Sequence, residues 1–172
     1  MGSERKKRNI YLVGLMGAGK TTIGKVLARR LSYSFIDSDH EIARRTGVSV
    51  PTIFEIEGEE GFRKREAQII AEIAALDTQV VATGGGVVLR PENRQLLLSN
   101  GLVVYLNVPL HTLYERTRHD KNRPLLQVQD PLQKLKELHI QRDPLYREVA
   151  DIVVSGSRIA LQSILPLIAQ QI

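Results

Sequence analysis

The stretch Gly14-Leu15-Met16-Gly17-Ala18-Gly19-Lys20-Thr21 decides how the rest of the chain is interpreted. It satisfies the spacing G-x-x-x-x-G-K-[ST] and lies between an apolar run at residues 10–13, which predicts a strand, and a pattern that predicts a helix over residues 20–31. Glycines at this place let successive backbone N–H groups converge on phosphate oxygens, and the following helix adds its positive N-terminal end. The sequence therefore predicts a loop that binds a nucleoside triphosphate.

Two side chains of this loop carry the expected chemistry. Lys20 is predicted to reach the β- and γ-phosphates, and Thr21 supplies a hydroxyl to Mg²⁺. The other residues expected to contact ATP here are Gly17, Ala18, Gly19 and Thr22. The alternative is a glycine-rich turn that binds nothing, which the flanking strand and helix disfavour. The chain has no N-K-x-D guanine motif and no long apolar run ending in Asp-Glu, which argues against GTPases and large ATPases. Its small size favours a small-molecule kinase.

Short apolar runs alternate with longer amphipathic patterns along the chain. Strands are predicted at residues 10–13, 34–37, 79–83, 102–106 and 152–154. Helices are predicted at 20–31, 38–46, 51–76 with a break near Gly58, 91–99, 110–119, 131–141 and 158–169, and Asp143-Pro144 is expected to end the sixth. Strands apolar on both faces that alternate with helices indicate a three-layer α/β fold with a five-stranded parallel sheet.

Composition and charge bound the function further. The 172 residues suit one domain, 1–172, and 42% hydrophobic with 25% charged residues is ordinary for a globular protein. The net charge of +5 fits nucleic acid, an anionic membrane or a polyanionic small substrate. The absence of cysteine suits a reducing compartment, and no apolar run nears the length of a membrane span. The basic residues 5–8 before an apolar stretch imitate a signal peptide, but no cleavage site follows, so we expect a cytoplasmic protein.

A pair of carboxylates follows the second predicted strand. Asp37 and Asp39 flank Ser38 at the carboxyl end of this strand, where open α/β sheets place their ligands. Asp37 could act on Mg²⁺ through water, and Asp39 could accept hydrogen bonds from a substrate hydroxyl. The alternative is a capping box formed by Ser38 and Glu41, with Asp39 in the first helical turn. Both interpretations can hold together.

Three further features point to an acceptor site. Arg63 lies at the edge of an apolar helical stripe, where it can face a cleft, although a surface pair with Glu66 is the simpler alternative. Gly84, Gly85 and Gly86 end the third strand and allow a close approach to substrate or phosphate; a turn with positive φ is the alternative. Arg142 continues a buried leucine stripe by one turn and is suited to bidentate capture of a carboxylate.

The segment 118–130 is polar, basic and weakly periodic, which is typical of a functional surface loop. Basic residues gather on it and just before it: Arg116, Arg118, Lys121 and Arg123. Nucleic-acid sites interleave such residues with aromatic ones, and none lies between positions 116 and 123. We therefore expect a lid over phosphates and no nucleic-acid partner.

These residues together resemble the shikimate kinase family. The motifs that carry the resemblance are the P-loop, Asp37-Ser38-Asp39, Phe62-Arg63, Gly84-Gly85-Gly86, Arg123-Pro124-Leu125-Leu126 and Arg142-x-Pro144-Leu145-Tyr146, in the family's order. The resemblance covers residues 9–168 and implies ATP-dependent phosphorylation of the 3-hydroxyl of shikimate in aromatic amino-acid biosynthesis. It also implies a fold like that of nucleoside-monophosphate kinases, with sheet order 2-3-1-4-5, a lid at about 118–130 and a substrate-binding helical region at about 38–66.

The resemblance also implies roles for single residues. The expected shikimate contacts are Asp39, Arg63, Gly84, Gly85, Gly86 and Arg142, with the two arginines clamping the carboxylate. Lys20 and Arg123 are expected to stabilise the transferring phosphoryl group, and Lys20, Asp39 and Arg123 form the expected catalytic set. One Mg²⁺ is expected at Thr21 and Asp37.

Arg116 is expected to stack on adenine, and Arg158 contacts the nucleotide from a loop that aligns only loosely with the family. The expected partners are shikimate and ATP, and we expect a monomer that binds neither nucleic acid nor a membrane. Two alternatives stay open: a kinase for another hydroxy acid such as gluconate, and a P-loop protein that binds nucleotide without turnover.

Overall fold

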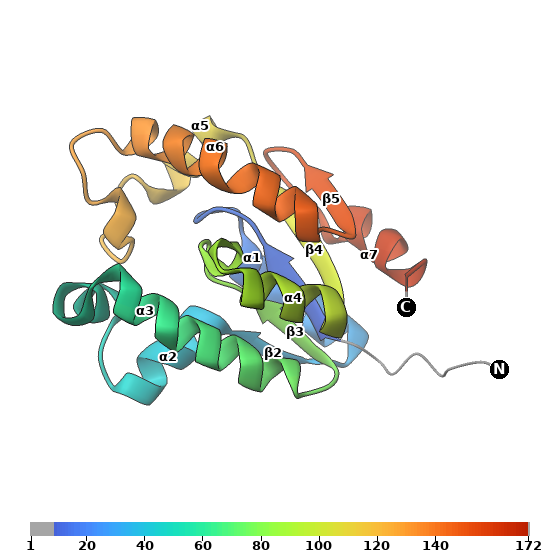
Figure 1. The fold of residues 1–172 in the computed structure, drawn as a ribbon. Coiled ribbons are helices and arrows are strands. Elements are labelled where there is room, and N and C mark those ends of the chain that lie inside the picture. Colours follow the sequence, from blue (N-terminus) through green and yellow to red (C-terminus); the bar gives the residue numbers. More distant parts are fainter. Residues whose placement is uncertain (1–8, 172) are drawn as a thin grey trace.

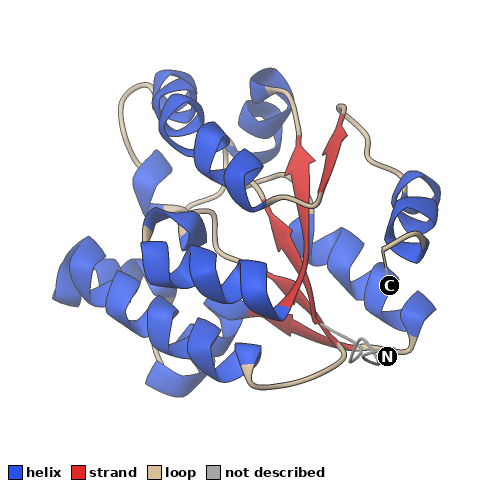
Figure 2. Cartoon of the chain, turned by 45° about the vertical axis from the view of Figure 1, so that its right-hand side comes forward, coloured by secondary structure: helices blue, strands red, loops and turns tan. Residues whose placement is uncertain are grey.

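Residues 9–171 of the computed structural model form a parallel sheet between two layers of helices (Figures 1 and 2). The strands are β1 Asn9–Val13, β2 Ser34–Asp37, β3 Gln79–Ala82, β4 Gly101–Asn107 and β5 Ile152–Ser155. Their order in the sheet is β2-β3-β1-β4-β5, and every neighbouring pair is parallel. The predicted strands and their order are confirmed. The basic run at residues 5–8 lies outside the described residues.

The helices cover both faces of this sheet. They are α1 Lys20–Leu31, α2 Ser38–Thr46, α3 Val50–Ala74, α4 Pro91–Asn100, α5 Leu110–Thr117, α6 Pro131–Val149 and α7 Leu161–Ala169, with short 3₁₀ turns η1 Val87–Leu89 and η2 Pro124–Leu126. The crossover connections put α1, which packs against α7, on one face, and α3, α4 and α6 on the other (Figure 2). Among the described residues, no helix is both long and apolar enough to cross a membrane.

Helix α3 bends at Gly58, which has φ 73° and ψ 178°, so the predicted break is confirmed. The predicted end of the sixth helix is wrong, because α6 runs through Pro144 to Val149. Proline costs a helix about 3 kcal/mol by removing one N–H and crowding the carbonyl four residues earlier. Here the residue at that place, Ile140, is 75% exposed, and burial of Tyr146 and Val149 continues the packed face of the helix beyond the proline. Tertiary packing therefore outweighs the proline.

The register of the sheet aligns the loops that follow three strands. Leu12 of β1 and Asp37 of β2 both pair with Ala82 of β3. Thr83 then donates its amide and its hydroxyl to the carbonyl of Leu12, at 3.2 and 2.7 Å. The P-loop, Asp37 and the glycines after β3 therefore begin at one level, on the carboxyl edge of the sheet.

Candidate functional site

The P-loop is a backbone cradle whose shape depends on glycine. Gly17 and Gly19 have φ of 83° and 94°, a region that side chains disfavour, and Gly19 caps the N-terminus of α1. A Cβ at Gly17 would lie 2.8 Å from Cγ2 of Thr117, and one at Gly14 would lie 2.7 Å from the carbonyl of Leu106. The loop thus requires glycine both for its conformation and for its packing on β4 and α5.

Lys20 folds back over this loop. Its Nζ donates to the carbonyls of Gly14 at 2.5 Å and Leu15 at 3.1 Å. Burial lowers the pKa of the ammonium to about 7; Arg123 lowers it too, while the charge of Asp39 opposes this. A phosphate at the P-loop would restore the charged form, so this lysine is matched to an anionic ligand.

Asp37 and Thr21 meet beside Lys20. The Thr21 hydroxyl donates to Oδ2 of Asp37 at 2.7 Å, and Oδ1 of Asp37 accepts from the amide of His40 at 3.1 Å. Asp37 is therefore the N-cap of α2, and the capping box predicted from Ser38 and Glu41 is wrong. Ser38 is instead buried, and its Oγ accepts a hydrogen bond from the amide of Gly84 at 3.0 Å. The adjacent hydroxyl and carboxylate oxygens of Thr21 and Asp37 fit the oxygen donors that Mg²⁺ prefers.

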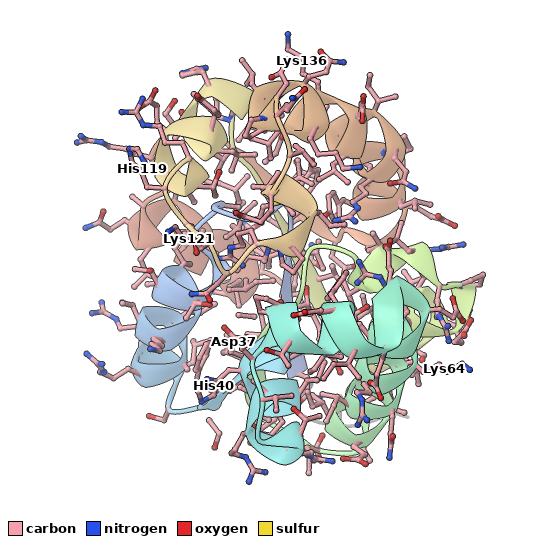
Figure 3. The ribbon with its side chains drawn as sticks, turned by 90° about the vertical axis from the view of Figure 1, so that its left-hand side faces the viewer. Asp37, His40, Lys64, His119, Lys121 and Lys136 are labelled. Carbon is pink, nitrogen blue, oxygen red and sulfur yellow. The ribbon has the colours of Figure 1, made fainter. Side chains whose placement is uncertain are left out.

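A cavity of about 550 Å³ opens over the P-loop. It is lined by all the residues predicted to bind nucleotide: Gly17, Ala18, Gly19, Lys20, Thr21, Thr22, Arg116, Arg123 and Arg158. Arg116 donates to the carbonyl of Gly17 at 2.9 Å and to that of Ser157 at 2.8 Å, which ties the P-loop to the loop after β5. Figure 3 views this side, where Lys121 of the lid segment lies above Asp37 and Lys64 lies at the outer edge of α3.

A second, smaller cavity of about 50 Å³ adjoins the first. It is lined by all six residues predicted to bind the acceptor: Asp39, Arg63, Gly84, Gly85, Gly86 and Arg142. Five residues line both cavities: Met16, Asp39, Gly84, Gly85 and Arg123. These five mark the place where a phosphoryl group and an acceptor would meet.

Each of the three glycines after β3 makes room for a different charged side chain. A Cβ at Gly84 would lie 2.5 Å from Oδ1 of Asp39. A Cβ at Gly85 would lie 3.3 Å from Nη1 of Arg142, and one at Gly86 would overlap the guanidinium of Arg63. None of the three has a positive φ, so a turn that needs positive φ is wrong, although the chain does turn here, with the amide of Val87 donating to the carbonyl of Gly84 at 3.1 Å. The glycines do lie close to other groups, namely side chains of the site itself, and their close approach to substrate or phosphate stays a prediction.

Arg63 and Arg142 are buried guanidinium groups in this cavity, with exposed fractions of 7% and 1%. Arg63 pairs with Oε1 of Glu66 at 3.0 Å and with Oε1 of Glu59 at 3.3 Å, so the predicted pair with Glu66 exists but is buried. Neither arginine has a hydrogen-bond partner for its Nε within residues 9–171. Because buried charges normally find partners, these donors suit an anionic ligand.

Burial in this pocket also shifts the pKa values of two carboxyl groups. Burial raises the pKa of Asp39, and the nearby charge of Asp37 raises it further. Burial likewise raises the pKa of Glu66 to about 7, against the effect of Arg63. Oδ1 of Asp39 and Oε2 of Glu66 both lie close to Gly84 without a hydrogen-bond partner in the described chain. A raised pKa makes Asp39 suited to receive a proton from a hydroxyl.

The lid segment places Arg123 at the junction of the cavities. Its Nε pairs with Oδ2 of Asp120 at 3.2 Å, and η2 follows directly. The carboxylate of Asp120 also accepts the amide of Asn122 at 2.8 Å, and Gln127 donates to the carbonyls of Asp120 and Arg123 at 3.0 and 3.1 Å. These contacts shape the segment around the arginine.

Sequence reasoning missed several residues that line the acceptor cavity. Met16 occupies a variable place of the P-loop motif, and Phe54 lies on the first half of α3. Glu66 is completely buried, which its position three residues after Arg63 does not reveal. The available signal was the repeat of buried positions along α3, in which Phe62, Glu66 and Ile69 share one face.

Comparisons with known proteins agree with this geometry. A sequence model described as shikimate kinase matches residues 16–172. The shikimate kinase of Dechloromonas aromatica is 66% identical over 165 residues, which cover 96% of this chain and 90% of that protein.

Solved structures extend the comparison. A shikimate kinase from Acinetobacter baumannii in complex with shikimate superposes with a TM-score of 0.93 and 51% identity, over 95% of this chain and 94% of that one. A gluconokinase from Sinorhizobium meliloti reaches a TM-score of 0.54 at 18% identity, over 95% of this chain and 90% of that one, a likeness of fold alone.

Proposed function

The chain belongs to the shikimate kinase family, and we propose that it transfers the γ-phosphoryl group of ATP to the 3-hydroxyl of shikimate, giving shikimate 3-phosphate and ADP. The observation that carries this proposal is the meeting of two cavities at Asp39 and Arg123. One cavity has a P-loop floor, and the other offers two buried guanidinium groups near a buried carboxylate. The reaction would serve chorismate and aromatic amino-acid biosynthesis.

In this proposal Arg63 and Arg142 clamp the carboxylate of shikimate. Two buried guanidinium groups whose Nε atoms have no hydrogen-bond partner in the described part of the chain support this role, because a carboxylate accepts paired N–H bonds in a fixed geometry. Gly84, Gly85 and Gly86 would let these charged groups lie close to the backbone and would border the ring of shikimate. The clamp would select acceptors that carry an acid.

The oxygen of the shikimate 3-hydroxyl would attack the γ-phosphorus of ATP while its proton passes to Asp39. The bond from the γ-phosphorus to the bridging oxygen breaks, and ADP leaves. The raised pKa of Asp39 supports this role, since a more basic carboxylate accepts a proton more readily. Lys20 and Arg123 would stabilise the charge on the transferring phosphoryl group from two sides, one from the P-loop and one from the lid. Such a reaction needs positioning and charge neutralisation more than covalent catalysis by the enzyme.

One Mg²⁺ would be held by Thr21 directly and by Asp37 through water. When bound, the ion neutralises negative charge on the β- and γ-phosphates of ATP. Gly17, Ala18, Gly19 and Thr22 would surround the phosphates. Arg116 would stack on adenine while its edge bonds the carbonyls of Gly17 and Ser157, and Arg158 would close the same end of the cavity.

Two segments would move around the ligands within the single domain 1–172: the lid at about 118–130 and the substrate-binding helical region at about 38–66. The chain would act as a monomer. We place it in the cytoplasm, where ATP is abundant, and assign it no partner besides shikimate and ATP.

The test is an ADP-release assay with Mg²⁺ and ATP that compares shikimate, gluconate and no acceptor. We expect turnover with shikimate alone. The matched variant is Asp39→Asn, which keeps the shape of the side chain and should lose turnover while still binding ATP.

Turnover with gluconate instead of shikimate would contradict the acceptor assignment. ATP binding without acceptor-dependent turnover would favour a nucleotide-binding regulator. Full activity of Asp39→Asn would contradict the role given to Asp39.

A further inference from the structure

We propose that Tyr146 is a positioning residue for the acceptor site: its hydroxyl fixes the Gly85 peptide and thereby sets the separation between Arg142 and the P-loop. The inference rests on the proposed phosphorylation of shikimate and deepens it. Tyr146 lines neither cavity, so it would act only through the residues that do.

The contact itself joins distant parts of the chain. The hydroxyl of Tyr146 donates to the carbonyl oxygen of Gly85, 61 residues earlier in the sequence. Tyr146 is completely buried, and its ring packs on Tyr105 with centroids 4.9 Å apart. The phenol, whose ordinary pKa of 10 already keeps it protonated at neutral pH, is raised by burial to a pKa of about 12, against the charge and hydrogen bond of Arg142, so the hydroxyl stays a donor. Without this donor the half-buried carbonyl would lose its hydrogen-bond partner in the protein.

Gly85 lies between the two functional halves of the site. A Cβ at Gly85 would lie 3.3 Å from Nη1 of Arg142. It would also lie 3.6 Å from the carbonyl oxygen of Gly14 and 3.7 Å from the amide nitrogen of Met16, both in the P-loop. A shift of this peptide would therefore move the acceptor clamp relative to the nucleotide cradle.

One helix carries both the anchor and the clamp. Arg142 and Tyr146 are four residues apart in α6, so they lie on the same face one turn from each other. Fixing Gly85 to Tyr146 therefore also fixes it relative to Arg142. The helix that continues through Pro144 makes this pairing possible, since a helix that ended there would not present Tyr146 in this register.

Other helices hold the neighbouring peptides of the same segment. Ser38 of α2 accepts the amide of Gly84. From α4, Asn93 donates to the carbonyl of Val87 at 3.0 Å and Arg94 donates to that of Val88 at 2.7 Å. Tyr146 adds the link to α6, which follows the lid. Residues 84–88 are thus held by hydrogen bonds from three helices. The bond from α6 is to Gly85, which lines both cavities.

The test compares Tyr146→Phe with Tyr105→Phe. Each removes one hydroxyl oxygen from a buried tyrosine of the same pair, and the hydroxyl of Tyr105 anchors α6 through Oδ1 of Asp143 at 2.8 Å. For Tyr146→Phe we expect KM and Kd for shikimate to rise about tenfold, the effect of one misplaced hydrogen-bonding group. Its KM for ATP and its kcat should stay within about twofold, and Tyr105→Phe should leave all of these values within the same limit.

Equal effects of the two variants on shikimate KM would overturn the inference, because general anchoring of α6 would then suffice. A tenfold rise in the KM for ATP, equal to the rise in the KM for shikimate, would also overturn the inference. Melting temperatures and calorimetric Kd values at low temperature separate binding from folding, so a less stable Tyr146→Phe still decides the question. A wild-type chain that does not turn over shikimate refutes the proposed function first, whatever the variants do.

Discussion

The nucleotide cradle and the acceptor pocket are neighbours built in opposite ways. The cradle is one continuous stretch between β1 and α1, shaped by backbone groups and by glycines with positive φ. The acceptor pocket collects side chains from α2, α3, the segment after β3, the lid and α6. The first is a local structure that the fold displays, and the second exists only when distant elements have packed.

The two regions also handle charge differently. Backbone N–H groups and the end of α1 present partial charges that need no counterion. The acceptor pocket instead buries charged side chains. Each of these needs an oppositely charged neighbour, as the ion pair between Arg63 and Glu66 shows. Substitutions in the cradle should therefore affect the chemical step, and substitutions in the pocket should affect acceptor binding and folding together.

The largest effect is expected from Lys20→Ala in the cradle. It removes a donor aimed at the transferring phosphoryl group, and we expect kcat to fall roughly 10²- to 10³-fold, about 3–4 kcal/mol. The matched control is Lys25→Ala, an exposed lysine on the same helix. Steady-state kinetics with both substrates check this, and near-normal turnover would contradict the role of Lys20.

Arg63→Ala should have a smaller kinetic effect, and among the two substrates it should concern only the acceptor. It removes binding to a carboxylate that does not react, so KM for shikimate should rise roughly 30- to 100-fold, about 2–3 kcal/mol, with little change in KM for ATP. Arg65→Ala is the control, because Arg65 lies on the same helix but is exposed and pairs with Glu57. If only the KM for ATP changed, the clamp assignment would be wrong.

The same contrast explains what could be predicted. Helices α1 and α2 and strand β2 begin and end where the sequence indicated, because their signals are local: the P-loop, the residues that cap helices and short apolar runs. The candidate residues also fell into the two cavities. The continuation of α6 past Pro144 and the burial of Glu66 depend on packing between distant elements. The bond from Tyr146 to Gly85 spans 61 residues, and local pattern carries no sign of it.

The glycines of the acceptor pocket allow a sharper test, because a single methyl group should separate binding from chemistry. Gly86→Ala would displace the guanidinium of Arg63, and we expect KM for shikimate to rise about tenfold, about 1.4 kcal/mol. Gly84→Ala would displace the carboxylate of Asp39, so kcat should fall instead. Kinetics for both variants check this split, and identical changes in both would indicate a general loss of packing.

The smallest expected signal is a proton taken up when ATP binds to the cradle. Burial lowers the pKa of Lys20 from its ordinary value of 10.5 to about 7, so at pH 8.5 the side chain is mostly neutral. Bound phosphates favour the charged ammonium and raise this pKa, so binding should take up close to one proton at pH 8.5 and almost none below pH 6. Calorimetry in two buffers of different ionisation enthalpy measures the uptake, with Lys20→Ala as the control. Equal heats in both buffers at pH 8.5 would show that Lys20 already carries its charge before the nucleotide binds. The positive potential of the cradle would then come from the Lys20 side chain as well as from the backbone.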